Sequence, residues 1–237
     1  EVKTIVTHIK EVKAGQNLGY GFAYKATENV INSEETNLET ESVEQSGVAL
    51  MSARSTSYVY NETDFRNALS ARAGTIITYG SINFYSPIYI NYEVTVTCAT
   101  NENALRYGGT GSFIVIQNGG TLNLEAMVVD GRGMAGSNGI YCINVQSGGK
   151  LRMKSSSIID GGLSNTGLLL NNGSSASFYS AHVAYSGVGI RVKGNASLVF
   201  YNLSDGRSSE FWNNTTAISF EGFTGTTNFN QSNIKIY

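Results

Sequence analysis

The sequence of 237 residues has few charged side chains, a single proline, two cysteines and no long apolar run. Charged residues make up 14% of the chain, and 16 basic residues are balanced by 18 acidic ones. No excess of positive charge therefore indicates a nucleic-acid-binding protein. The apolar runs, such as the one at 113–116, have the length of a strand and fall short of the roughly 18 residues that span a bilayer. We expect neither a nucleic-acid partner nor a membrane span.

Glycine and aromatic residues are plentiful, with 27 Gly, 14 Tyr and 10 Phe, as is typical of an all-β protein with many turns. Five similar segments recur, each with an apolar stretch, a turn and a second apolar stretch. Their starts are separated by 28, 28, 22 and 28 residues and lie at Gly111, Gly139, Gly167, Gly189 and Ala217. A period of this length indicates a solenoid in which each repeat is one coil.

Each period contains three short strands, because a third apolar stretch ending in a small or acidic residue and glycine follows most of the segments. Alternation directs pairs such as Leu122 and Leu124 into the interior. A helix over 61–72, with Asn61 as N-cap and Phe65 on its apolar side, covers the first coil. The prediction is an all-β right-handed parallel β-helix with three faces, over about 58–237, with a short N-terminal capping α-helix.

The turns carry a Gly-Gly-x-Leu-x-Leu pattern, as Gly-Gly-Thr-Leu-Asn-Leu at 119–124 and Gly-Gly-Lys-Leu-Arg-Met at 148–153. The pattern after a short helix resembles the pectin-lyase-like β-helix superfamily and, more narrowly, the adhesin-like surface repeats of bacteria and archaea. The resemblance implies a secreted or cell-surface protein whose partner is a polysaccharide or a host-surface glycan. That superfamily also contains lyases and hydrolases, so the resemblance is specific for the fold and weak for the activity.

The N-terminal segment 4–26, with Gly-Tyr-Gly around Tyr20, resembles a strand–turn–strand of the alanine racemase C-terminal β-domain. The resemblance makes Tyr20 the match of that family's catalytic tyrosine. The pyridoxal-phosphate barrel has no counterpart here, so racemase activity is not expected unless that barrel and its cofactor are supplied. The predicted organisation is a hairpin-like segment over 1–30, an acidic Ser/Thr/Asn-rich linker over 31–57 and the β-helix over 58–237.

Acidic corners are the first candidate for chemistry. With Ser186 in the intervening coil, three Asp-Gly corners are expected to share one edge of the solenoid: Asp130, Asp160 and Asp205. Carboxylates one rung apart suit a structural Ca²⁺ at Asp130 and Asp160, the only cofactor we would expect. Arg132 and Arg207 follow two of these corners and suit a lyase, which needs cations for a sugar carboxylate and a base for the adjacent proton. The alternative is that Asp-Gly is a favoured turn dipeptide.

Arg191 and Lys193 form an Arg-x-Lys element that resembles the one in polygalacturonase-type β-helices, where it implies a cationic contact to a carboxylated substrate. Alternation places both side chains outside. The acidic pair and the Gly-His-Gly element of those enzymes are missing from the sequence, and a solvated basic strand is the alternative interpretation.

Aromatic residues are the third candidate, because an exposed aromatic ring can stack on a sugar whereas an inward one only fills the core. The candidates for ligand binding are Tyr85, Tyr89, Tyr201 and Trp212. The favoured function is non-enzymatic adhesion or glycan binding. The alternatives are a lyase or glycosidase acting on an acidic polysaccharide, and a truncated fusion that carries a non-functional racemase remnant.

Two further expectations concern association and cysteine. No C-terminal cap is evident after the last strand at 233–237, so we expect a monomer or end-to-end association through this coil. Cys98 and Cys142 are expected to be free thiols, since at about 25 residues per coil they lie about two rungs apart, too far for a disulfide. Cys142 alternates out of phase with the apolar Ile143 and Val145.

Overall fold

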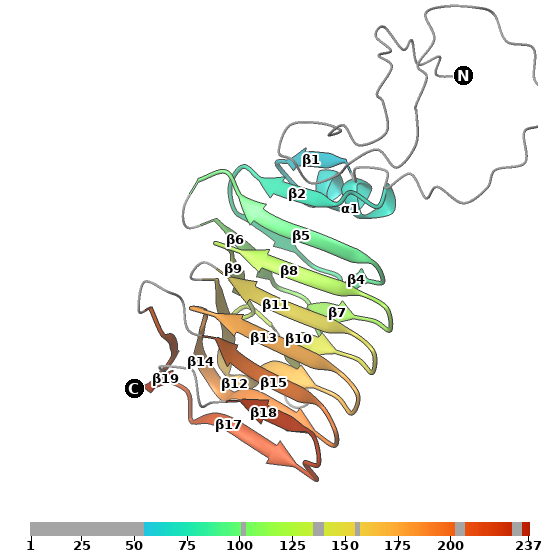
Figure 1. Ribbon diagram of the computed structural model, residues 1–237. Coiled ribbons are helices and arrows are strands. Elements are labelled where there is room, and N and C mark those ends of the chain that lie inside the picture. Colours follow the sequence, from blue (N-terminus) through green and yellow to red (C-terminus); the bar gives the residue numbers. More distant parts are fainter. Residues whose placement is uncertain (1–54, 101–102, 135–139, 155–156, 202–206, 229–233) are drawn as a thin grey trace, which may run out of the picture. The chain divides into compact units, whose positions relative to one another are not determined.

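The computed structural model describes residues 55–100, 103–134, 140–154, 157–201, 207–228 and 234–237. Stacked parallel strands form a β-solenoid with a short helix at its N-terminal end (Figure 1). The structure confirms the predicted fold class, a right-handed parallel β-helix with three faces. The predicted segments 1–30 and 31–57 lie almost entirely outside the described residues, as does Tyr20, so those boundaries stay predictions.

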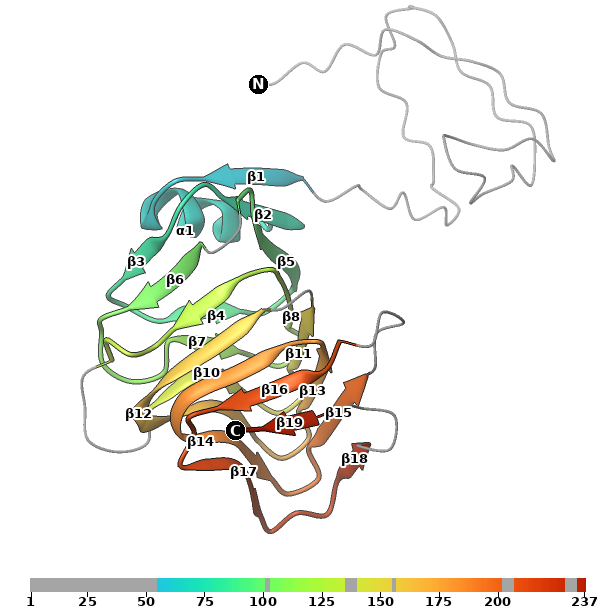
Figure 2. The same ribbon diagram turned by 90° about the vertical axis from the view of Figure 1, so that its left-hand side faces the viewer.

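Three faces surround one core, and the views in Figures 1 and 2 show them on different sides of the stack. The first face is β1 (Thr56–Val59), β2 (Thr75–Thr78), β5 (Glu93–Cys98), β8 (Thr121–Glu125), β11 (Lys150–Lys154), β13 (Ser175–Tyr179), β15 (Ser197–Tyr201) and β18 (Thr226–Asn228). The second face is β3 (Ile82–Phe84), β6 (Ala104–Tyr107), β9 (Val128–Asp130), the first parts of β12 (Ile158–Leu170) and β14 (His182–Lys193), β16 (Ser209–Trp212) and β19 (Ile234–Ile236). The third face is β4 (Ile88–Ile90), β7 (Ile114–Ile116), β10 (Tyr141–Val145), the last parts of β12 and β14, and β17 (Thr216–Glu221).

Alternation along the strands builds the core from columns of like residues. One column on the first face runs through Val96, Leu124, Met153, Phe178 and Phe200, each in register with the next. All five side chains are buried. A single coil has too little apolar surface to form a core, so the stacking of such columns stabilises the fold.

The helix α1 (Glu62–Ser70) closes the N-terminal end of the core. The Oδ1 atom of its N-cap, Asn61, accepts a hydrogen bond of 2.9 Å from the backbone N–H of Asp64. Phe65 is buried and meets the ring of Phe84 edge to face at 5.2 Å. This confirms the predicted capping helix. Among the described residues, no helix is long and apolar enough to span a membrane.

Both cysteines are free thiols, as predicted. Cys98 is partly buried and packs against the core, whereas Cys142 is fully buried. Cys142 and Ile143 are adjacent in β10 and both are buried, so the strand does not follow strict alternation here, and the Sγ atom of Cys142 lies 3.6 Å from the carbonyl oxygen of Val129.

At one corner of the solenoid, two strands continue from one face onto the next without interruption. β12 and β14 each run from the second face onto the third, and their register shifts between Gly162 and Thr166. Gly162 has a φ of 78°, which favours glycine. The neighbouring coil has Tyr185 at this corner with a φ of 46°, an uncommon value for a bulky residue. The candidate site lies around this corner.

The C-terminal coil is less covered than the rest of the stack. Within the part of the chain that the structure describes, β17, β18 and β19 each pair with one neighbouring strand only. Phe220 and Ile236 are 44% and 66% exposed. Association through this coil stays a prediction.

Candidate functional site

Two of the acidic corners predicted from the sequence, at Asp130 and Asp160, lie side by side on the second face. Asp130 ends β9 and is in register with Arg106 of β6 on one side and with Asp160 of β12 on the other. The predicted edge of Asp130 and Asp160 is therefore present, one rung apart. Both carboxylates are largely buried, with side-chain exposures of 11% and 7%.

The predicted continuation of this edge through Ser186 is wrong. Ala184 is in register with Asp160, and Trp212 follows Ala184 in the next coil. Ser186 pairs with Gly162 instead, because the register set by Ile159 and Val183 continues unchanged as far as Gly162. Asp205 lies outside the described residues.

Arg132 holds the two carboxylates together. Its Nε and Nη2 atoms donate hydrogen bonds of 3.0 Å to Oδ1 and Oδ2 of Asp130, and the same Nε lies 3.0 Å from Oδ2 of Asp160. The backbone N–H of Arg132 also donates to Asp130 Oδ1. Because Arg132 is only two residues after Asp130, the Asp-Gly-Arg turn itself forms this clamp. Arg132 is 57% exposed and presents its remaining surface outward.

The two carboxyl groups differ in their electrostatics. Burial opposes ionisation of Asp130, but the hydrogen bonds from Arg132 and the charges of Arg132 and Arg106 outweigh it and lower its pKa. Burial raises the pKa of Asp160 to about 6; the charge of Arg132 opposes the change and the charge of Asp130 adds to it. The hydrogen bond to Asp130 raises the pKa of Arg132. Asp160 Oδ1 is buried without a hydrogen-bond partner.

A calcium ion suits this arrangement poorly. Both oxygens of Asp130 and one oxygen of Asp160 already contact Arg132, whereas Ca²⁺ takes six to eight oxygen ligands. In the described ranges, no group of three or more His, Cys, Asp or Glu residues is placed to hold a metal. The calcium site at Asp130 and Asp160 stays a prediction that the donor set does not favour.

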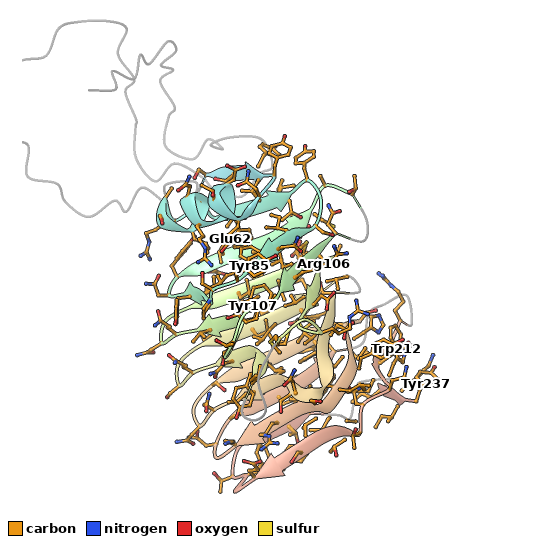
Figure 3. All side chains as sticks on the ribbon, turned by 180° about the vertical axis from the view of Figure 1, so that it is seen from behind. Glu62, Tyr85, Arg106, Tyr107, Trp212 and Tyr237 are labelled. Carbon is orange, nitrogen blue, oxygen red and sulfur yellow. The ribbon has the colours of Figure 1, made fainter. Side chains whose placement is uncertain are left out.

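A cavity of about 220 Å³ opens beside this clamp, and we name it the tyrosine–arginine cavity. It is lined by Asn83, Tyr85, Arg106, Tyr107, Gly108, Asp130, Arg132 and Gly133. Figure 3 shows Tyr85, Arg106 and Tyr107 near one another on this side of the stack. The cavity brings the predicted Tyr85 together with the predicted Asp130 and Arg132.

Glycine permits the close packing of the cavity walls. A Cβ atom at Gly108 would lie 3.2 Å from Cε1 of Tyr85, so the ring of Tyr85 rests against this backbone. The ring of Tyr107 stacks on Phe113 at 4.7 Å, and its hydroxyl donates to the carbonyl oxygen of Thr110. Tyr107 is thus fixed as part of the wall, whereas Tyr85 is 71% exposed and free to meet a ligand.

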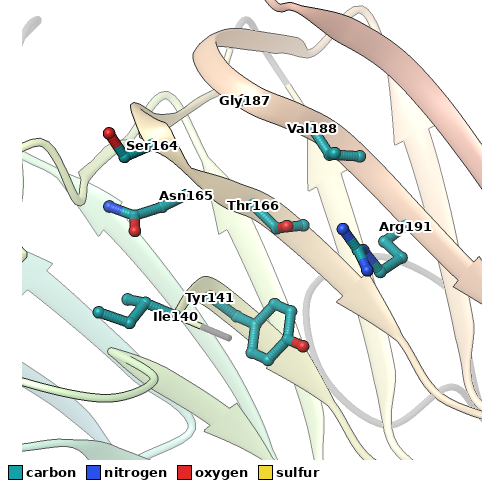
Figure 4. A pocket seen from close by; sticks show the side chains of 8 residues that line it. All are labelled: Ile140, Tyr141, Ser164, Asn165, Thr166, Gly187, Val188 and Arg191. Atoms are coloured by element: carbon teal, nitrogen blue, oxygen red, sulfur yellow. The ribbon is translucent and has the colours of Figure 1, made fainter. Parts of the chain in front are cut away.

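The Arg-x-Lys element lies on β14, on the outer surface of the third face. Arg191 Nη1 and Lys193 Nζ contact the two carboxylate oxygens of Glu221 at 2.7 and 3.3 Å. Both side chains point outward, as predicted, and neither reaches the acidic clamp. Arg191 lines a second cavity, which we name the Arg191 cavity (Figure 4).

The other predicted aromatic residues are dispersed. Tyr89 is 57% exposed on β4 of the third face, and Tyr201 on β15 stacks on Tyr179 at 4.5 Å. Trp212 stacks on His182 at 4.7 Å and donates from Nε1 to Glu210. Figure 3 shows Trp212 well away from Tyr85 along the stack. Arg207 precedes β16 and does not line either cavity.

Several residues at or near the site were missed from the sequence, among them Arg106 and Tyr185. Arg106 lies between the inward-facing Leu105 and Tyr107, so alternation along the strand predicts that its side chain faces outward. Alternation does not predict that Arg106 is in register with Asp130 of the next coil. Tyr185 is 42% exposed at the corner and close enough to Arg132 to influence its pKa. Its positive φ gives no signal in the sequence.

No model of a known protein family matches this sequence, and no curated protein matches it with significant similarity. The parallel β-helix rests on the structure alone. The pectin-lyase-like and adhesin-like identity, secretion and glycan binding stay predictions.

Proposed function

We propose that this β-helix is a non-enzymatic module of a secreted or cell-surface protein, and that it binds acidic carbohydrate in the tyrosine–arginine cavity. The observation that carries the proposal is the position of Tyr85, a largely exposed aromatic ring, beside two exposed arginines in one concave site. Aromatic faces and a few convergent polar groups are typical of ligand sites. The resemblance to surface repeats supports the location.

The arginines suit an anionic group on the sugar. Arg106 is 54% exposed, and its nearest contact to Asp130 is 3.8 Å, which leaves its N–H groups available to a ligand. Arg132 is held in place by Asp130 and Asp160, so little side-chain entropy remains to be lost on binding. A carboxylate or sulfate between the two guanidinium groups would accept charge-assisted hydrogen bonds.

Binding is favoured over catalysis because the site lacks an available base. Both oxygens of Asp130 accept hydrogen bonds from Arg132, and the free oxygen of Asp160 is buried. A lyase remains the second candidate on one observation, the pKa of about 6 for Asp160, which lies in the range of a general base. Movement of Arg132 would be needed to expose this carboxyl group.

The test is calorimetric binding of the 237-residue protein to an acidic polysaccharide panel (polygalacturonate, alginate, chondroitin sulfate), with neutral glucans as controls. We expect binding to at least one acidic glycan, reduced about tenfold or more by Tyr85→Ala. Tyr89→Ala removes a tyrosine on another face that is 57% exposed, against 71% for Tyr85, and should leave the affinity unchanged. Equal losses in both variants, or no binding to any acidic glycan, would refute the proposal.

The same samples distinguish the lyase. Release of unsaturated uronides, abolished by Asp160→Asn, would replace the binding function with catalysis. Intact polysaccharide after long incubation would support the non-enzymatic module.

A further inference from the structure

Two tyrosine rings lie face to face on the outer surface of the first face. Tyr179 of β13 and Tyr201 of β15 have ring centres 4.5 Å apart and ring planes within 4° of parallel. The two strands pair in parallel with Tyr179 opposite Tyr201, and both side chains are partly exposed. The pair therefore joins two neighbouring coils on the side that solvent reaches.

The core beneath the pair keeps the two rings in register. Phe178 and Phe200 directly precede the tyrosines, are fully buried and stack on each other at 5.0 Å. Because parallel strands lie about 4.8 Å apart, side chains at the same position of two coils repeat at nearly this distance. The tyrosine rings cannot move out of register without disturbing the buried phenylalanines.

The hydroxyl groups of the pair are aligned as well as the rings. Burial raises the pKa of the Tyr179 hydroxyl, and the charge of Tyr201 and a hydrogen bond with its hydroxyl raise it further. Contact between the hydroxyl groups means that the two rings are superposed and not offset along their length. The Cε carbons next to the hydroxyl groups therefore lie opposite one another, and these carbons carry unpaired electron density in a tyrosyl radical.

This arrangement suits oxidative coupling of the two phenols. A peroxidase that consumes hydrogen peroxide takes one electron and one proton from each phenol. The two radicals then join in a carbon–carbon bond between their Cε atoms, and the hydrogen atom on each of these carbons moves to its phenolic oxygen. The hydrogen peroxide takes up the two electrons and two protons and becomes two molecules of water.

We propose that Tyr179 and Tyr201 form a site of oxidative modification, at which a peroxidase with hydrogen peroxide links two coils covalently and stabilises the stack. The two rings are held in contact within one molecule, so their coupling needs no encounter between molecules. The inference is independent of the proposed function, since carbohydrate takes no part in the reaction.

A second pair of exposed tyrosines provides a comparison within the same chain. Tyr60 and Tyr79, near the N-terminal end of the first face, have ring centres 5.1 Å apart and planes 20° from parallel. Both are more exposed than Tyr201, so an oxidant reaches them more easily, but their rings are less well aligned. Preferential coupling of Tyr179 with Tyr201 would show that alignment decides the product.

The test is treatment of the full 237-residue protein with a haem peroxidase and hydrogen peroxide, at about 1 µM protein to disfavour coupling between molecules. Mass spectrometry should find a monomer lighter by two hydrogen atoms, with Tyr179 and Tyr201 in one cross-linked peptide pair. Tyr201→Phe and Tyr179→Phe should each lower the yield of the lighter monomer about tenfold or more, because phenylalanine keeps the ring but forms no phenoxyl radical. Tyr89→Phe, which changes an exposed tyrosine on the third face, should leave the yield unchanged.

Several outcomes would overturn the proposal. Coupled dimers in place of the lighter monomer, a link confined to Tyr60 and Tyr79, or an undiminished yield in Tyr201→Phe would each refute it. The link joins residues that are 22 positions apart and restricts the unfolded chain more than the folded one. The isolated cross-linked protein should therefore unfold at a higher urea concentration than the untreated protein, and an unchanged or lower midpoint would refute the stabilising role.

Discussion

Replacing Asp160 with asparagine is expected to stabilise the protein at neutral pH, although it removes an ion pair with Arg132. Burial raises the pKa of Asp160 from 3.8 to about 6 despite the nearby guanidinium, so the folded protein holds this proton more tightly than the unfolded chain. The resulting stabilisation is complete below pH 3.8 and is lost as the pH rises through about 6. The full loss is about 3 kcal/mol, which asparagine avoids because it cannot ionise.

The assay is urea unfolding of the unmodified protein and Asp160→Asn at about pH 4.5 and pH 8. The linkage between proton binding and folding predicts that the free energy of unfolding of Asp160→Asn, relative to the unmodified protein, increases by about 2 kcal/mol from pH 4.5 to pH 8. Asp130→Asn is the matched control with the opposite sign, since the lowered pKa of Asp130 means that its ionised form stabilises the fold. It should lose stability at pH 8, and part of that loss should disappear as the pH falls. A difference for Asp160→Asn that is constant with pH, or that favours aspartate at pH 8, would refute the reasoning.

Two further predictions concern the clamp and the thiols. Arg132→Gln leaves two nearly buried carboxylates one rung apart without their common partner, and it should lower the free energy of unfolding in urea by about 3 kcal/mol. The control is Arg152→Gln, which breaks an exposed ion pair with Glu93 and should change the free energy of unfolding by no more than about 0.5 kcal/mol. Equal effects of the two substitutions would contradict the role of the clamp. Burial raises the pKa of the Cys142 thiol well above its usual range, so native alkylation followed by mass spectrometry should modify Cys98 first and Cys142 only after denaturation. Equal rates in the native protein would show that Cys142 is more accessible than the structure indicates.

The fold was predictable because it depends on a local pattern that repeats. Alternation within short strands identified the inward Leu122 and Leu124, and the capping residues of α1 are contiguous in the sequence. Both signals act over a few residues, and each is repeated or reinforced by its neighbours. The prediction needed no knowledge of how one coil sits on the next.

The site was only partly predictable because it depends on register. The turn dipeptides suggested that Asp160 lies beside Ser186, whereas the buried pair Ile159 and Val183 fixes the actual register and brings Ala184 to that position. The two registers differ by two residues, which keeps every side chain on the same face, so alternation alone could not distinguish them and the packing of the core decides the alignment. The contribution of Arg106 from the preceding coil has the same origin.

The short sequence separation between paired strands has a consequence for how the chain folds. Thr75 pairs with Thr95, and Asp130 with Asp160, which are 20 and 30 residues further along. The entropy of closing each coil is therefore about the same wherever the coil lies, and it does not grow with the length of the stack. The capping helix and the first coil are also the first described parts to be synthesised. Each later coil meets a template that is already formed, so the chain is suited to winding in the direction in which the ribosome makes it.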